Sequence, residues 1–122
     1  MNEPLEILKL YEELLKRPFI PFPKKGGIKE CQNQGVYIIA SPKNLVLHVG
    51  RTVKGMNGIN QRLNNHLRNQ SSFSKKYLLP NEINLRNGCF YKYLQVKNAR
   101  KRALVEALTS GLICPKHIGT GK

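Results

Sequence analysis

The chain has 122 residues and a mass of 13.9 kDa, which suits one compact domain and is too little for two. Its 21 basic and 7 acidic residues give a formal net charge of +14, so we expect a polyanionic partner, nucleic acid before an anionic membrane surface. Every acid is a glutamate, and the absence of aspartate argues against sites built from several carboxylates, such as two-metal clusters and calcium loops.

The first expected element is an amphipathic helix over residues 4–16, because four apolar residues recur at helical spacing and Pro4 suits a first turn. The apolar stripe consists of Leu5, Leu8, Tyr11 and Leu15. Residues 17–27 contain three prolines and two glycines, which end the helix and favour an extended linker. We therefore divide the chain into a helix with its linker (residues 1–22) and a main domain (residues 23–122). We expect the helix stripe to pack on that domain, and the alternative is that it faces a partner.

Two apolar runs rich in β-branched residues, 35–40 and 45–50, predict a β-hairpin. The Ser-Pro-Lys-Asn sequence between them favours a turn. A four-residue loop places Tyr37 directly opposite His48 on one face of the hairpin. The other face would be wholly apolar, pairing Ala40 with Leu45, Ile38 with Leu47 and Val36 with Val49.

A helix of about ten residues is expected after Gly58 from its apolar periodicity. The apolar positions are Ile59, Leu63 and Leu67. Arg62 and His66 lie four residues apart on this helix, so their side chains can reach the same site. A short helical turn is expected within residues 71–79, and residues 89–96 alternate as a third strand.

The last expected helix covers residues 99–110, with Asn98 as its N-cap and Gly111 at its end. Glu106 lies in the middle of this helix. A surface ion pair with Arg102, four residues earlier, explains Glu106 about as well as a functional role does. Glu106 is the only acid after residue 82, and this scarcity favours the functional role.

Cysteine usage and hydropathy indicate the compartment. The three widely spaced cysteines, Cys31, Cys89 and Cys114, fit neither a disulfide framework nor a zinc knuckle. Residues 1–17 carry a charge every few positions, and no run approaches the roughly 20 apolar residues of a membrane span. We expect a cytoplasmic protein without membrane attachment, whose reduced thiols fill the core.

Several sequence pieces, taken together in this order and spacing, resemble the GIY-YIG nuclease family. The pieces are Gly-Val-Tyr at residues 35–37, His-Val-Gly-Arg-Thr at residues 48–52, Arg62 with His66, and Glu106. Each piece is weak alone, but the combination is fairly specific and covers roughly residues 34–118. The resemblance implies a small α/β domain, in which helices flank a three-stranded antiparallel sheet, and metal-dependent cleavage of a DNA phosphodiester bond.

The resemblance also implies a role for each matching residue. Glu106 would hold one Mg²⁺ or Mn²⁺ ion, and a single carboxylate suffices because Mg²⁺ keeps several waters and also binds phosphate. Arg62 would grip a nonbridging phosphate oxygen as negative charge accumulates on it. Tyr37 would activate or orient the attacking water, with neighbouring cations or a bound metal lowering its pKa from about 10, and His66 would exchange protons nearby. Each of these residues also has a plain structural explanation, as a solvated arginine, a core tyrosine or a hydrogen-bonding histidine.

The sequence departs from the family pattern in two places. His48 stands where the second motif usually has tyrosine, and it could either accept the phenolic proton of Tyr37 or mark a weakened enzyme. Near the end of the chain the family commonly has asparagine after a proline, whereas Pro115 is followed here by Lys116 and His117. His117 could substitute for that asparagine, or the role could be lost.

Several basic residues and one threonine around the motifs are candidates for phosphate contacts, because such contacts fix a protein on a nucleic acid without reading its sequence. The nucleic-acid-binding candidates are Arg51, Thr52, Lys54, Arg68, Lys75 and Lys76. If several such side chains neutralise phosphates, binding should weaken steeply with added salt.

The functional hypothesis is a metal-dependent endonuclease that hydrolyses DNA. Its catalytic residues would be Tyr37, His48, Arg62, His66 and Glu106. The alternative is a non-catalytic nucleic-acid-binding module on the same fold, which the two departures permit. A basic protein that attaches to structured RNA or ribosomes is a third possibility.

Overall fold

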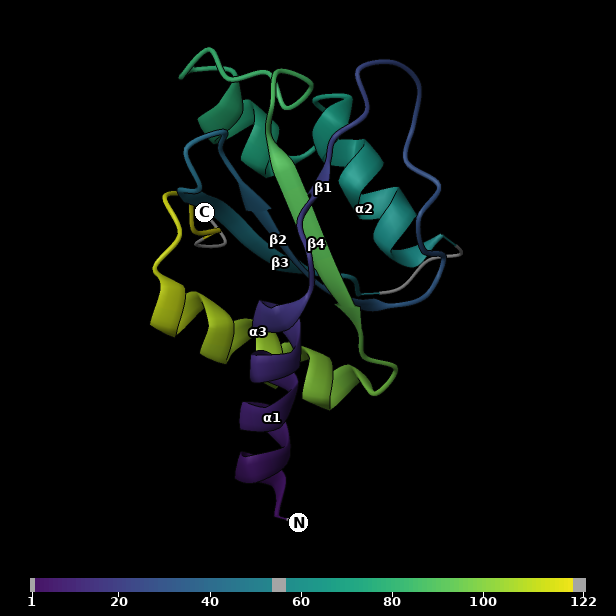
Figure 1. Ribbon diagram of the computed structural model, residues 1–122, viewed down its shortest axis with the longest axis vertical. Coiled ribbons are helices and arrows are strands. Elements are labelled where there is room, and N and C mark those ends of the chain that lie inside the picture. Colours follow the sequence, from purple (N-terminus) through teal and green to yellow (C-terminus); the bar gives the residue numbers. More distant parts are fainter. Residues whose placement is uncertain (1, 54–56, 120–122) are drawn as a thin grey trace.

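The computed structural model of the protein describes residues 2–53 and 57–119, which form a small α/β domain (Figure 1). Its antiparallel sheet has the strand order β1-β4-β2-β3. The elements are α1 (Glu3–Lys16), β1 (Ile20–Pro21), β2 (Gly35–Ala40), β3 (Val46–Arg51), α2 (Gly58–Leu67), the short π-helical turn η1 (Ser74–Leu78), β4 (Phe90–Gln95) and α3 (Ala99–Ile113). None of the helices in these ranges has the length and apolar character needed to cross a membrane.

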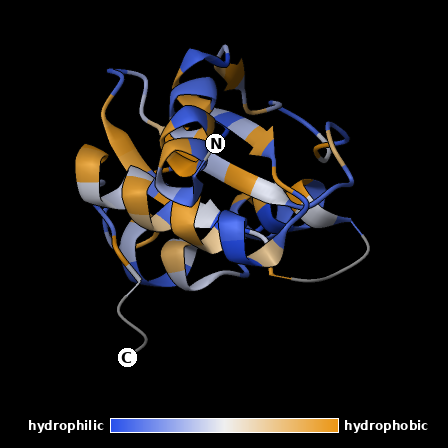
Figure 2. Cartoon of the chain, turned by 90° about the horizontal axis from the view of Figure 1, so that it is seen from below, coloured by the Kyte–Doolittle hydropathy of each residue, from blue (hydrophilic) through white to orange (hydrophobic). Residues whose placement is uncertain are grey.

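The sheet separates two apolar cores, and β2, at its centre, is buried along its whole length. Because side chains alternate along a strand, β2 supplies residues to both cores in turn. The core beneath α2 and η1 includes Tyr37, Ile39, Ile59, Leu63, Leu67 and Phe73. The core beneath α1 and α3 includes Ile7, Leu14, Val36, Ile38, Val49 and Val105. Figure 2 shows the resulting alternation of hydrophobic and hydrophilic residues along helices and strands.

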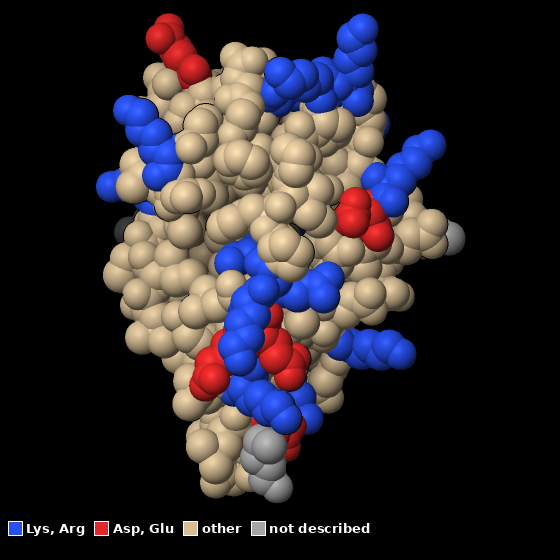
Figure 3. All heavy atoms as spheres, viewed as in Figure 1, with Lys and Arg blue, Asp and Glu red and all other residues tan. Residues whose placement is uncertain are grey.

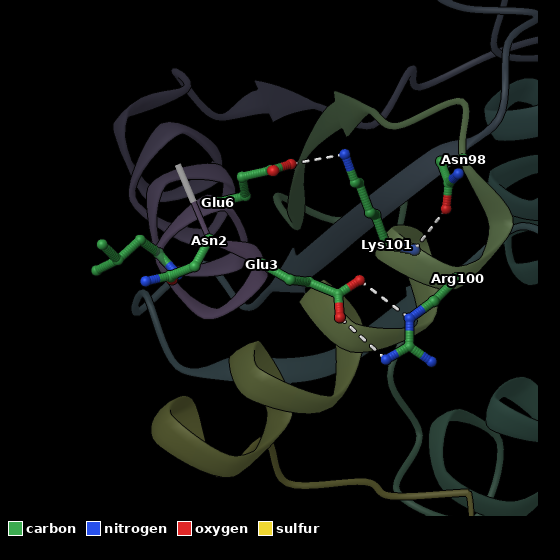
Figure 4. A network of polar contacts seen from close by, with 7 residues as sticks. Asn2, Glu3, Glu6, Asn98, Arg100 and Lys101 are labelled. Atoms are coloured by element: carbon green, nitrogen blue, oxygen red, sulfur yellow. Dashed lines mark hydrogen bonds and ion pairs between the residues drawn. The ribbon is translucent and has the colours of Figure 1, made fainter.

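Helix α1 docks against the main domain beside α3 (Figure 1). Leu14 is completely buried in the core that the two helices share. Two ion pairs span the helices (Figure 4): Glu3 with Arg100 at 3.0 Å, and Glu6 with Lys101 at 2.6 Å. Exposed pairs of this kind add little stability, so the buried apolar side chains hold α1 in place.

The buried face of α1 is not the one expected from the sequence. Ile7 and Leu14 are buried and Leu10 is half-buried, whereas Leu5, Leu8 and Leu15 of the predicted stripe are exposed. Tyr11 is the one residue of that stripe that is half-buried. Both sets have helical spacing, so periodicity alone could not choose between them. The glutamates that meet the basic first turn of α3 lie next to the buried set and favour the observed orientation.

The β2–β3 register also differs from the prediction, because Tyr37 pairs with Gly50 and Ile39 pairs with His48. The backbone N–H of Ser41 donates to the carbonyl of Leu45, so the loop is one residue shorter than expected, and Asn44 within it has a φ of 62°. An irregularity between Ile39 and Ala40 shifts the register by one more residue. This bulge turns Leu47 toward the α2 core, instead of the face that it was predicted to share with Ile38 and Val49.

Two further expectations about the elements were wrong. The sheet has four strands because linker residues Ile20–Pro21 pair with β4, and Pro21 is tolerated because β1 is an edge strand. Helix α3 continues through Gly111 to Ile113 and ends where Cys114, with a φ of 54°, precedes Pro115. Cys31 and Cys89 are buried as expected, but Cys114 is exposed.

Candidate active site

A cavity of about 360 Å³ opens where β2, β3, α2 and α3 meet the C-terminal segment. Its walls include all five residues that the sequence singled out for catalysis. They are Tyr37, His48, Arg62, His66 and Glu106. These residues come from four different elements, so the fold, rather than sequence proximity, brings them together.

Tyr37 reaches this cavity because strand alternation points it toward α2 and because Gly50, its cross-strand partner, has no side chain. A Cβ atom on Gly50 would lie 2.4 Å from the Tyr37 hydroxyl oxygen, so any larger residue there would displace the phenol. The hydroxyl lies 2.7 Å from Nε2 of His66. Glycine at this position therefore allows the phenol to cross β3 and reach α2.

The pKa of Tyr37 moves in the direction opposite to the one expected. Burial raises the pKa to about 12, and the charge of nearby Arg62 opposes this shift only in part. The expected effect of a neighbouring cation is present, but it is smaller than the effect of burial. At a pKa of 12 about one phenol in 10⁵ is ionised at pH 7, which corresponds to about 7 kcal/mol. Tyr37 is therefore a neutral phenol at rest.

His66 joins Tyr37 to a small buried network of hydroxyl groups. Its Nδ1 lies 2.6 Å from the Ser71 hydroxyl, which lies 3.1 Å from the Ser74 hydroxyl. Burial lowers the pKa of His66 well below its usual value, so the ring is neutral. Neither serine was expected to belong to the site, and the only signal in the sequence is the run of serines that follows the Arg62–His66 helix.

His48 is not the cross-strand partner of Tyr37, as the predicted register had made it, although the two ring centroids lie 6.1 Å apart. Its ring stacks on Phe73, with the centroids 4.3 Å apart, and its Nδ1 lies 3.3 Å from Nδ1 of His117. Burial and the charges of nearby groups lower the pKa of His48 to about 3. His48 is therefore neutral, and His66 occupies the position of proton partner to Tyr37 that the sequence had suggested for His48.

Glu106 is held by Arg51, whose Nη1 lies 2.5 Å from its Oε1. Arg102, the partner that a surface ion pair would use, points elsewhere and is almost fully buried. Its guanidinium donates hydrogen bonds to the carbonyl groups of Thr52, Val53, Val96 and Lys97. The Arg102 explanation of Glu106 is therefore excluded, and the carboxylate belongs to the cavity.

The residues of the cavity fit some metal ions and not others. Among the described residues that line it, Glu106 supplies the only carboxylate. In the described parts of the chain, no three histidine, cysteine or glutamate side chains are grouped closely enough to hold a metal. Zinc, which takes three or four protein ligands, does not fit. Mg²⁺ or Mn²⁺ fits through Glu106, provided that water and a phosphate supply the other ligands and that the Arg51–Glu106 ion pair opens.

The cavity also carries positive charge suited to an anion. Arg51 and Arg62 both line it, against the single negative charge of Glu106. The charge of Lys76, on η1, contributes to lowering the pKa of His117, which lines the cavity. Lys76 therefore lies close to the cavity. Two guanidinium groups in one concave site favour binding of a phosphate group.

The remaining nucleic-acid-binding candidates are scattered. Thr52 is 1% exposed, and its hydroxyl accepts a hydrogen bond from the backbone N–H of Gly35, so the prediction that it contacts phosphate was wrong. Lys54 lies outside the described residues. Arg68 lines a separate cavity of about 600 Å³ on another side of α2, whereas Lys75 is exposed on η1. Figure 3 shows basic side chains spread over one face of the molecule and most acidic ones gathered around α1.

Comparison with protein-family models and with curated protein sequences finds no match to this chain. The function therefore has to be inferred from the geometry and the chemistry of the cavity.

Proposed function

We propose that this protein is an endonuclease of the GIY-YIG type that hydrolyses DNA phosphodiester bonds with the help of Mg²⁺ or Mn²⁺. The observation that supports the proposal best is the shared cavity, in which a phenol, a guanidinium and a lone carboxylate converge from separate elements. The three residues are Tyr37, Arg62 and Glu106. The order of the sequence motifs supports the same conclusion independently of the geometry.

In this mechanism the scissile phosphate lies against Arg62, whose forked guanidinium stabilises the negative charge that builds up on a nonbridging oxygen. Tyr37 orients the attacking water through its neutral hydroxyl group, and His66 is the proton partner of that hydroxyl. Arg51, at the cavity wall, supplies a second cationic contact for the phosphate. A metal ion held by Glu106 would add positive charge beside the phosphate.

A non-catalytic nucleic-acid-binding module is the second candidate, and one observation favours it. Arg51 already neutralises Glu106, the one carboxylate that the described residues place in the cavity. A site in which this ion pair persisted would keep a basic groove for DNA and would lack a metal ligand. The two candidates differ in whether Glu106 is needed to cut DNA.

The discriminating experiment is incubation of supercoiled plasmid with the purified protein and Mg²⁺. We expect the wild type to nick the plasmid, EDTA to stop the reaction, and Glu106→Gln to bind DNA without cutting it. Glu12→Gln is the matched control, because Glu12 is an exposed glutamate on α1, away from the cavity. Retarded but uncut DNA with every form would favour the binding module, and equal cutting by Glu106→Gln and wild type would refute the proposal.

A further inference from the structure

The buried hydroxyl network beside His66 has a fixed direction, which follows from counting its hydrogens. His66, Ser71 and Ser74 are all at most 5% exposed, so water does not supply alternative partners freely. The network begins at the backbone carbonyl of His66, which lies 2.7 Å from the Ser74 hydroxyl. A carbonyl oxygen only accepts, so the single hydroxyl hydrogen of Ser74 must point at it.

The next two steps follow from the same inventory of donors and acceptors. Ser74 has given its hydrogen away, so at 3.1 Å it accepts from the Ser71 hydroxyl. Ser71 has then used its own hydrogen, and its oxygen also accepts from the backbone N–H of Ser74 at 3.1 Å. The remaining contact of Ser71, at 2.6 Å from Nδ1 of His66, therefore requires that Nδ1 carry the hydrogen.

A neutral imidazole carries one hydrogen, so a hydrogen on Nδ1 leaves Nε2 with a bare lone pair. Nε2 is the atom 2.7 Å from the Tyr37 hydroxyl, and it must accept the phenolic hydrogen. The opposite tautomer would require Ser71 to donate to Nδ1. Its hydroxyl could then no longer donate to Ser74, and the buried network would lose one hydrogen bond.

We propose that Ser71 and Ser74 are positioning residues that hold His66 in the Nδ1–H tautomer and so present the Nε2 lone pair to the Tyr37 hydroxyl. The inference rests on the proposed function only for its catalytic consequence. There, the attacking water loses a proton to the phenol oxygen while the phenolic O–H bond breaks and an Nε2–H bond forms. The hydroxide so produced bonds to phosphorus. The leaving oxygen departs with the electrons of the P–O bond and takes a proton from water. His66 then returns its proton to solvent.

The test is the tautomeric state of His66, measured by long-range ¹H–¹⁵N correlation in protein with ¹⁵N-labelled histidine at pH 7 without DNA. We expect the wild-type His66 to show a protonated Nδ1 and an unprotonated Nε2. Ser71→Ala should produce a mixture or the Nε2–H form, because Nδ1 loses its acceptor. Ser74→Ala should cause a smaller change, because Ser71 keeps its oxygen but is free to turn its hydrogen toward Nδ1. Ser41→Ala, in the β2–β3 loop, is the matched control.

An Nε2–H form of His66 in the wild type would overturn the proposal, whether or not the serine variants fold. An unchanged tautomer in a folded Ser71→Ala protein would overturn it as well. In the cleavage assay, Ser71→Ala should slow cutting about 10- to 100-fold at unchanged DNA affinity. A wild type that carries the Nδ1–H form but fails to cut DNA would support the tautomer assignment and refute the endonuclease function alone.

Discussion

Mild acid should destabilise this fold through the cavity histidines before the glutamates are protonated. Burial against Phe73 holds the pKa of His48 at about 3, compared with 6.5 for a free histidine, and the charges of Arg62 and His117 add to the shift. The unfolded chain therefore binds a proton more readily than the folded one. The stability that neutral His48 contributes is complete above pH 6.5 and is lost as the pH falls from there toward 3.

The two pKa values set the magnitude of this effect. Between pH 7 and pH 5 the linkage relation gives a loss of about 2 kcal/mol from His48 alone. His66, whose pKa burial also lowers, contributes in the same direction. The assay is urea unfolding at both pH values for the wild type and for His48→Gln, which removes the titrating group.

We expect the wild type to lose about 2 kcal/mol more than His48→Gln over this interval. Contributions from the glutamates are shared by both proteins and largely cancel in the difference. The charge of His48 also contributes to lowering the pKa of His66, so the difference reports His48 together with its coupling to that ring. Equal losses would mean that His48 is protonated as easily in the folded chain as in the unfolded one. That result would refute the burial argument for the cavity.

Three further predictions concern packing, polar contacts and binding. Gly50→Ala should displace the Tyr37 phenol, destabilise the fold by about 1 to 3 kcal/mol in urea unfolding and abolish cleavage. Normal activity in this variant would contradict the close approach of Gly50 and Tyr37. Arg102→Met should lower the free energy of unfolding by about 3 kcal/mol, because buried carbonyl groups at the end of β3 and before α3 lose their hydrogen-bond donor. An unchanged urea midpoint would contradict the role of Arg102 as that donor. The logarithm of the DNA association constant should fall with the logarithm of salt concentration with a slope of about −5 if six phosphates are neutralised, and a slope near zero would contradict electrostatic binding.

The elements with one strong periodic signal were predictable from the sequence. The apolar spacing of Ile59, Leu63 and Leu67 placed α2 correctly, and that helix then fixed Arg62 and His66 on the same side. Asn98 was also identified correctly as the N-cap of α3, because its side chain accepts from the backbone N–H of Lys101. In these cases the local pattern and the tertiary packing favour the same arrangement.

Features that depend on competing or long-range interactions were not predictable in this way. The register of the hairpin depends on the left-handed conformation of Asn44 and on a bulge at Leu47, and no sequence pattern predicts either feature uniquely. The sequence could not reveal that burial would raise the pKa of Tyr37, because the pKa depends on packing by residues far along the chain. The contacts of Ser71 and Ser74 likewise depend on how η1 folds back on the end of α2.

The most direct test of the convergent site is the rate of single-turnover cleavage of DNA in Mg²⁺ by the wild type, Arg62→Ala and Glu106→Gln. Both residues line the cavity that contains Tyr37, and each is proposed to act on the same phosphate. Each substitution should slow cleavage by at least about 100-fold, with DNA binding retained. Cleavage by either folded variant at the wild-type rate would contradict the claim that these side chains work together on one phosphodiester bond.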